Sequence, residues 1–111
     1  MIIKPQIEES LRFIVKTTRE IMLVSAIYLF GSHANGASGE SSDLDIYIVT
    51  PDKSKRRVDW AIQARKAFGA VIKIPIDVVV NYDDEFERRS KINISFEHEV
   101  ANKGVDISAY Q

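Results

Sequence analysis

Residues 26–50 read AIYLFGSHANGASGESSDLDIYIVT, and this stretch decides what kind of fold the chain forms. The apolar run Ala26–Phe30 is partly β-branched and aromatic and stops at Gly31, which predicts a buried strand bounded by a turn. Residues 31–42 hold three glycines, four serines and no large apolar side chain, so we expect a loop with room for one helical turn. Residues 43–49 alternate between two faces, which predicts a second strand that begins with acid.

The rest of the chain follows helical and strand periods in turn. We expect an amphipathic helix over residues 7–22, a second helix over 54–68 and a third strand over 74–80. Two short helices around Phe86 and Phe96 are expected within residues 83–104, and an edge strand over residues 105–110. Ser54 is expected to cap the second helix and Gly69 to end it. Asp83 or Asp84 should cap the next helix, and the last should end at Gly104.

This order of elements predicts an α/β (α+β) domain with a small mixed β-sheet flanked by helices. The short loop returns the chain beside the first strand, whereas the helix before the third strand permits a parallel crossover. With 111 residues, the chain is expected to form one domain over residues 1–111. Trp60, Phe68, Phe86 and Phe96 have the spacing of helix core positions, and we assign them no chemistry.

The composition excludes several classes of function. Fifteen basic and sixteen acidic residues give a net charge of −1, which argues against a broad nucleic-acid-binding surface. Without cysteine there is no disulfide framework and no thiolate zinc site. The first residues lack the apolar core of a signal peptide and no segment has the length of a membrane span, so we expect a cytoplasmic protein without membrane contact.

Three acidic residues on strands point to metal chemistry. Asp43 and Asp45 lie two apart, which places both carboxylates on one face with Cα atoms roughly 6.5 Å apart. Magnesium prefers such oxygen ligands, and two ions roughly 3.5–4 Å apart can clamp a phosphoryl displacement. Asp77 is the only acid in the third strand and needs a metal, a cation or solvent, so it either shares the metal site or pairs with a lysine or arginine.

The turn after the first strand suits a phosphate. Gly31 lacks a Cβ, so backbone N–H groups can approach an anion there, and the hydroxyl of Ser32 can add a donor. The run 53–57 is basic, but a charge run at the start of a helix is usually a solvated face. His98 is expected at the surface or in an interface.

These residues resemble a known family. The segments LFGSHANGA at 29–37 and SDLDI at 42–46 resemble the Gly-Ser…Asp-x-Asp signature of the polymerase-β-type nucleotidyltransferase superfamily. With IDVVV at 76–80, the chain is similar to its minimal nucleotidyltransferases. The resemblance implies that Asp43, Asp45 and Asp77 are catalytic and bind two Mg²⁺ ions. It also implies that Gly31, Ser32, Asp43 and Asp45 bind the nucleotide.

The implied reaction transfers a nucleoside monophosphate, AMP from ATP, to a hydroxyl acceptor. Minimal members are often encoded beside a small helical HEPN-type toxin and act as its antitoxin, so the acceptor is expected on such a partner protein. Many members carry basic residues at the positions of His33 and Asn35, where here only His33 can supply positive charge. The alternative is a non-catalytic antitoxin or scaffold subunit that binds nucleotide or partner, and a homodimer is compatible with either function.

Overall fold

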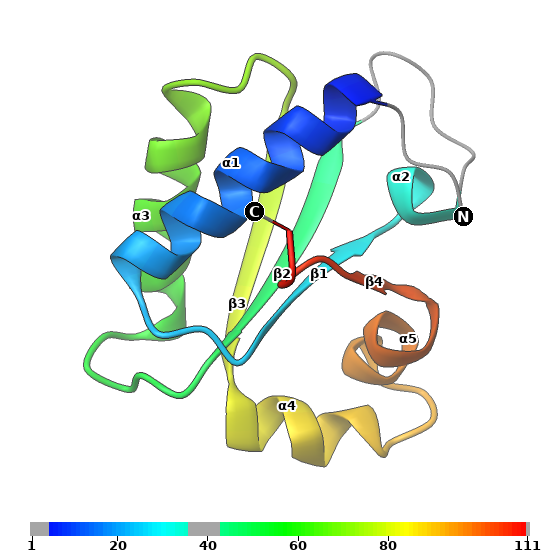
Figure 1. Cartoon of the computed structure of the whole chain (residues 1–111). Helices are drawn as coiled ribbons and strands as arrows, with labels where there is room; N and C mark the ends of the chain where they lie inside the picture. The colour runs from blue at the N-terminus through cyan, green and yellow to red at the C-terminus, as the bar shows by residue number, and fades with distance from the viewer. Residues whose placement is uncertain (1–4, 36–42, 111) are drawn as a thin grey trace.

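The computed structural model describes residues 5–35 and 43–110 of the chain. In these ranges, helices flank a central sheet on both faces (Figure 1). The elements are α1 (Pro5–Ile21), β1 (Ala26–Phe30), α2 (Ser32–Asn35), β2 (Leu44–Thr50), α3 (Arg57–Gly69), β3 (Ile76–Tyr82), α4 (Asp83–Ser90), α5 (Phe96–Lys103) and β4 (Val105–Asp106). The α+β architecture predicted from the sequence is confirmed.

The sheet is mixed, with the strand order β3-β2-β1-β4. β1 runs antiparallel to both β2 and β4, whereas β2 and β3 are parallel and are joined across one face by α3. The predicted return beside the first strand and the predicted parallel crossover are therefore both present. As a result, the end of β1 meets the starts of β2 and β3 at one edge of the molecule.

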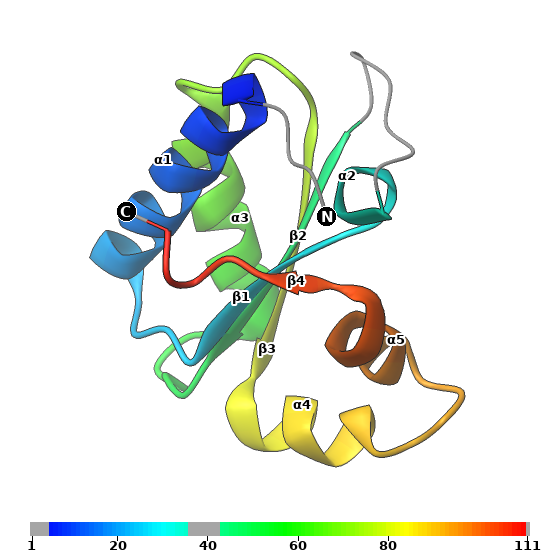
Figure 2. The same cartoon turned by 45° about the vertical axis from the view of Figure 1, so that its right-hand side comes forward.

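Each face of the sheet has its own helical layer (Figures 1 and 2). Because side chains alternate along a strand, Ile27 and Leu29 of β1 pack with α1 and α3, whereas Tyr28 and Phe30 face α4 and α5. β2 divides in the same way, with Ile46 in the first layer and Tyr47 in the second. Both faces are covered along the middle strands, and the acids predicted for the site lie near the strand ends.

Both predicted N-caps are wrong, and the end of α3 differs by one residue. α3 begins at Arg57 after Arg56, and the N–H of Ser54 donates to Asp52 Oδ1 at 2.9 Å within the preceding turn. Gly69 is the last helical residue and Ala70 is the C-cap, so the helix ends one residue later than expected. Several neighbouring residues could cap each end of a helix, and the sequence alone does not show which of them does so.

The third strand ends later than predicted, which explains the error at the N-terminus of α4. β3 runs to Tyr82, two residues beyond the predicted end, and Tyr82 becomes the N-cap of α4. Asp83 and Asp84 therefore occupy the first helical turn, where negative charge is favourable because of the helix dipole. The edge strand is also shorter than expected, since β4 contains only Val105–Asp106 before the chain turns.

The aromatic core predictions are mostly confirmed. Trp60, Phe68 and Phe86 are buried, but Phe96 at the start of α5 is 41% exposed, which contradicts its assignment as a simple core residue. His98 is half-buried and its Nδ1 lies 2.8 Å from the carbonyl oxygen of Ser90. Within the part of the chain that the structure describes, none of the helices is long and apolar enough to cross a membrane.

Candidate functional site

Gly31 is shaped to receive the carboxylate of Asp45. It follows β1 with φ of +75°, the left-handed region that only glycine adopts without cost. A Cβ at this position would overlap Asp45 Oδ2 and lie 3.2 Å from Asp45 Cγ. The C=O of Gly31 accepts a hydrogen bond from the N–H of Ala34 at 3.1 Å, which begins the short helix α2. The turn and the acid are thus matched sterically.

Ser32 is the first residue of α2. Its side chain, like residues 36–42, lies outside the described part of the chain, so its predicted contact with a phosphate stays a prediction. The predicted single helical turn within the loop is present as α2.

Asp45 and Asp77 face each other across the parallel pair of β2 and β3. Neighbouring strands lie about 4.8 Å apart, so residues in register on the same face are in reach of one another. Burial raises the pKa of Asp45, and the negative charges of Asp77 and Asp43 together with a hydrogen bond to Asp77 raise it further. The positive charge of His33 acts in the opposite direction. Two strands therefore bring carboxyl groups together that repel each other when both are ionised.

Asp43 lies just before β2 and is exposed, as Asp77 is. Its charge nevertheless reaches Asp45, so the three acids predicted from the sequence belong to one electrostatic cluster. None of the ion pairs among the described residues joins Asp77 to a lysine or arginine. Asp77 is exposed, so its carboxylate is accessible to solvent.

The chemistry of the donor set fits magnesium. The candidate ligand atoms are carboxylate oxygens, and a cation would relieve their mutual repulsion at Asp45. Among residues 5–35 and 43–110, no group of three or more His, Cys, Asp or Glu side chains is placed so that it could hold a metal ion by itself. Magnesium does not require one, because it is usually held by one or two carboxylates together with substrate phosphates and waters.

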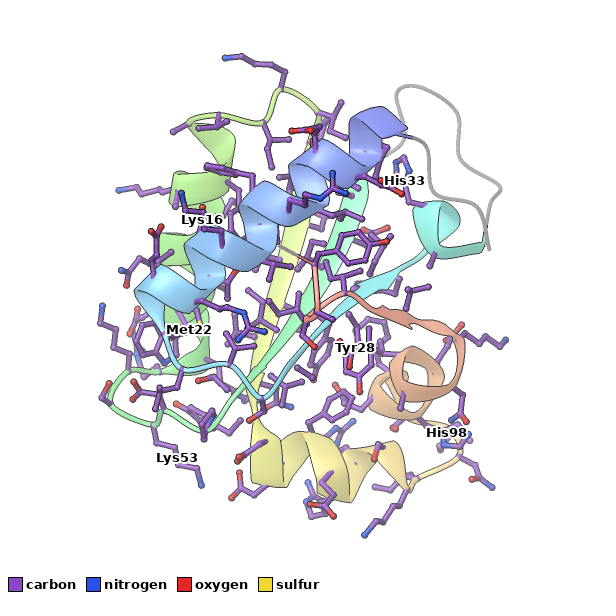
Figure 3. The ribbon with its side chains drawn as sticks, in the orientation of Figure 1. Lys16, Met22, Tyr28, His33, Lys53 and His98 are labelled. Atoms are coloured by element: carbon purple, nitrogen blue, oxygen red, sulfur yellow. The ribbon has the colours of Figure 1, made fainter. Side chains whose placement is uncertain are left out.

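His33 is the only histidine near the acids. It lies on α2, is buried, and in Figure 3 is seen on the side of α2 that faces α1. It is close enough to Asp45 to lower the pKa of that carboxyl. The neighbouring side chain of Asn35 lies outside the described part of the chain.

A buried polar network below the site was missed by sequence reasoning. The hydroxyl of Tyr47 donates to Glu97 Oε2 at 2.8 Å and accepts from Asn81 Nδ2 at 3.1 Å. Arg89 Nε donates to Glu97 Oε1 at 2.7 Å. The network joins β2, β3, α4 and α5. Tyr47 lies two residues from Asp45 on the same face of the sheet, so the network holds α5 near the acids.

The groups of this network are adjusted to one another. Burial raises the pKa of Tyr47 well above its usual value. Burial also disfavours the charge of Glu97, but hydrogen bonds from Arg89 and Tyr47 outweigh it and lower the pKa of this carboxyl. The sequence signal for Glu97 is weak, because a glutamate in the first turn of a helix is common at the surface.

The basic run 53–57 lies away from the acids. All five residues are exposed, and Lys53 Nζ pairs with Asp84 at 2.7 Å, in agreement with a solvated face. The run follows the far end of β2, whose seven residues span roughly 23 Å at 3.3 Å per residue. These cations are therefore not placed to contact a phosphate at Gly31.

Comparison with known proteins agrees with this geometry. Residues 5–107 match the model of the nucleotidyltransferase domain family. No curated protein matches the chain significantly in sequence. A crystal structure of a candidate nucleotidyltransferase from Sulfolobus solfataricus superposes with a TM-score of 0.63 at 22% identity, covering 91% of this chain and 78% of that one.

A second solved structure is a toxin–antitoxin complex with AMP-PNP. It gives a TM-score of 0.57 at 23% identity over 90% of this chain and 71% of that chain. At this level of identity, both structures show a shared fold. The family match extends over nearly all of the described residues, including Gly31, Asp43, Asp45 and Asp77. This chain therefore belongs to the nucleotidyltransferase domain family.

Proposed function

We propose that the chain is a magnesium-dependent nucleotidyltransferase that moves AMP from ATP to a hydroxyl group on a partner protein, such as a HEPN-type toxin. The observation that carries the proposal is the close approach of Asp45, which lies opposite Asp77, to Gly31. Gly31 has the one backbone conformation and the missing Cβ that allow the Asp45 carboxylate to lie against the turn. Acids and a phosphate-binding turn within contact distance are the requirements for chemistry on a metal-bound triphosphate.

Each residue has a distinct role in this reaction. Asp43 and Asp45 would hold both magnesium ions and Asp77 one of them, while Gly31 and Ser32 bind the triphosphate. Bound magnesium would neutralise the phosphate charge that develops during transfer. The acceptor hydroxyl oxygen forms a bond to the α-phosphorus, and the bond from that phosphorus to the bridging oxygen breaks. Pyrophosphate leaves with the electron pair, and Asp77 receives the proton of the hydroxyl and passes it to solvent.

A protein partner is supported by the toxin–antitoxin neighbour. That neighbour was solved as a complex of two proteins with an ATP analogue. The partner would therefore present the hydroxyl to the site formed by Gly31 and the acids.

The proposal is tested with labelled nucleotides. The protein is incubated with magnesium and α-labelled ATP, GTP, CTP or UTP, with and without the product of the neighbouring open reading frame. We expect label on the partner, most strongly from ATP. Asp45→Asn and Asp77→Asn should abolish the label while leaving the thermal transition in place, and Asp59→Asn on the remote helix α3 serves as the matched control.

The alternative, a non-catalytic antitoxin subunit, gives a different result in the same experiment. It would bind the partner or nucleotide with wild-type affinity but would leave the partner unlabelled with every nucleotide. Label transfer that persists in both Asp45→Asn and Asp77→Asn would instead show that chemistry occurs elsewhere in the protein.

A further inference from the structure

A small pocket lies between the end of β1 and α5, directly beside the candidate site. Its volume is about 180 Å³. The walls combine apolar side chains with two exposed charged ones, and the principal lining residues are Phe30, Gly31, Phe96, Glu99, Val100 and Lys103. Gly31 thus belongs both to the turn that receives Asp45 and to this pocket.

We propose that this pocket holds the nucleobase of the nucleoside triphosphate, stacked on the ring of Phe96, and that Lys103 contacts its phosphates. The inference rests on the proposed function, because it assumes that a nucleotide occupies the site at Gly31. It adds the part of the chain, α5, that recognises the nucleoside.

Position supports this assignment. Phe30 is the residue of β1 that lies opposite Asp45 in the antiparallel register, and Gly31 follows it. The pocket therefore begins where the acid cluster ends, so a nucleotide whose phosphates lie at Gly31 has its nucleoside within reach of α5. A complete drug-sized ligand usually occupies 300–1,000 Å³, so the smaller volume here suits a single ring system.

Phe96 has the properties of a stacking platform. It remains 41% exposed, although it contacts two other aromatic rings. The ring centroids of Phe30 and Phe96 lie 5.2 Å apart with planes at 80°, and Tyr47 lies 5.8 Å away on the other strand. These edge contacts hold the ring while part of it stays open to solvent. An aromatic face of this kind binds any base, because every base has a π-face.

The approach of α5 to β1 is built into the sequence. At Gly104, the C-cap of α5, an added Cβ would lie 2.5 Å from the carbonyl oxygen of Val100 and 3.3 Å from that of Leu29. A Cβ would therefore clash with the carbonyl of the helix itself and fit tightly against the strand, so glycine suits the point where α5 meets β1. The wall formed by Val100 and Lys103 is consequently held at a fixed distance from Gly31.

Lys103 supplies a positive charge that sequence reasoning did not find. The family motif offers only His33 near the turn, but the last turn of α5 brings Lys103 to the pocket that Gly31 lines. It takes part in none of the ion pairs found among the described residues. Its flexible stem and ammonium group suit contact with a phosphate as a point charge.

Two ligands separate the contributions of base and phosphate. Calorimetry with magnesium would compare the α,β-methylene analogue of ATP, which cannot be transferred, with inorganic tripolyphosphate, which lacks the nucleoside. We expect Phe96→Ala to weaken the nucleotide analogue by about tenfold and to leave tripolyphosphate unchanged, since stacking is lost. Lys103→Ala should weaken both ligands by a similar factor. Phe96→Leu, which keeps apolar volume without a π-system, should behave like Phe96→Ala.

Matched controls are available on the same protein. Ile94→Ala removes an apolar side chain that is 97% exposed and does not line the pocket, and Lys16→Ala removes a charge from α1 across the sheet (Figure 3). Both of these variants should bind the nucleotide analogue and tripolyphosphate as tightly as the wild type does. Thermal melts of all variants establish that they are folded.

The possible contrary results are distinct. Wild-type protein that binds neither ligand overturns both the proposed function and this inference. If the wild type binds the analogue and both Phe96 variants bind it as tightly as the wild type does, this inference alone is overturned. The inference is also overturned if Phe96→Ala weakens the binding of both ligands equally. It is likewise overturned if Phe96→Ala leaves nucleotide binding unchanged and abolishes partner binding, because the pocket would then be a docking site for the partner.

Discussion

Gly31 carries two constraints at once, a positive φ and contact with Asp45. Gly31→Ala should therefore lower the free energy of unfolding by about 1–3 kcal/mol and weaken magnesium-dependent nucleotide binding, because the new Cβ displaces the carboxylate. Gly69→Ala is the matched control, since Gly69 is helical and a Cβ there meets nothing within 4 Å. This change should stabilise the protein by roughly 0.5–1 kcal/mol. Urea denaturation of both variants tests the contrast, and equal effects would contradict it.

Glu97 should make stability depend on acidity. Its pKa in the folded protein is lowered, because the hydrogen bonds from Arg89 and Tyr47 outweigh the effect of burial. A lowered pKa means that the stabilisation is present above the unfolded value, near 4.5, and is lost as pH falls through the folded value. We expect Glu97→Gln to be less stable than wild type at pH 7 and to lose less stability between pH 5 and pH 3.

The measurement is the midpoint of urea unfolding as a function of pH. Glu87→Gln is the control, because Glu87 is exposed and forms only a 3.8 Å surface pair with Lys91. If the unfolding midpoint falls equally steeply towards acidic pH in wild type and Glu97→Gln, this carboxyl does not contribute to the pH dependence of stability.

At the scale of elements, strands were easier to predict than helix ends. Period-two alternation places Ile27 and Leu29 on one face and Tyr28 and Phe30 on the other, and burial on both faces leaves little choice of register. Helix ends depend on weaker and more local interactions, as the misassigned cap at Ser54 shows. Ser95, which was not predicted as a cap, in fact accepts from the N–H of His98 at 3.0 Å.

The two serines give a direct test. Ser95→Ala should destabilise the protein by about 1 kcal/mol or more, because α5 loses its cap and the hydrogen bond from Ser95 Oγ to the carbonyl of Arg89 at 2.6 Å. Ser54→Ala should change stability by less than about 0.5 kcal/mol, since Ser54 caps no helix. Thermal unfolding of both variants checks this ranking, and the reverse order would contradict it.

At the scale of the molecule, the topology turns a linear motif into a site. The antiparallel pairing of β1 and β2 brings the end of one strand to the start of the other, and the parallel crossover adds Asp77 opposite Asp45. The spacing of Asp43 and Asp45 predicted that they share one face, whereas Asp77 was a candidate because it is the only acid in the third strand. The sequence was insufficient to reveal Lys103 or Glu97, because both reach the region only through the packing of α5 on β1 and β2.

The most direct test of nucleotidyl transfer follows the two ends of the same ATP molecule. Parallel reactions with α-labelled and γ-labelled ATP, magnesium and the partner protein would measure label on the partner and label released as pyrophosphate. We expect α-label on the partner and an equal amount of γ-label in pyrophosphate, both lost in Asp45→Asn and on removal of magnesium with a chelator. Transfer of the γ-label, or release of inorganic phosphate without α-labelling, would contradict the assignment of this site.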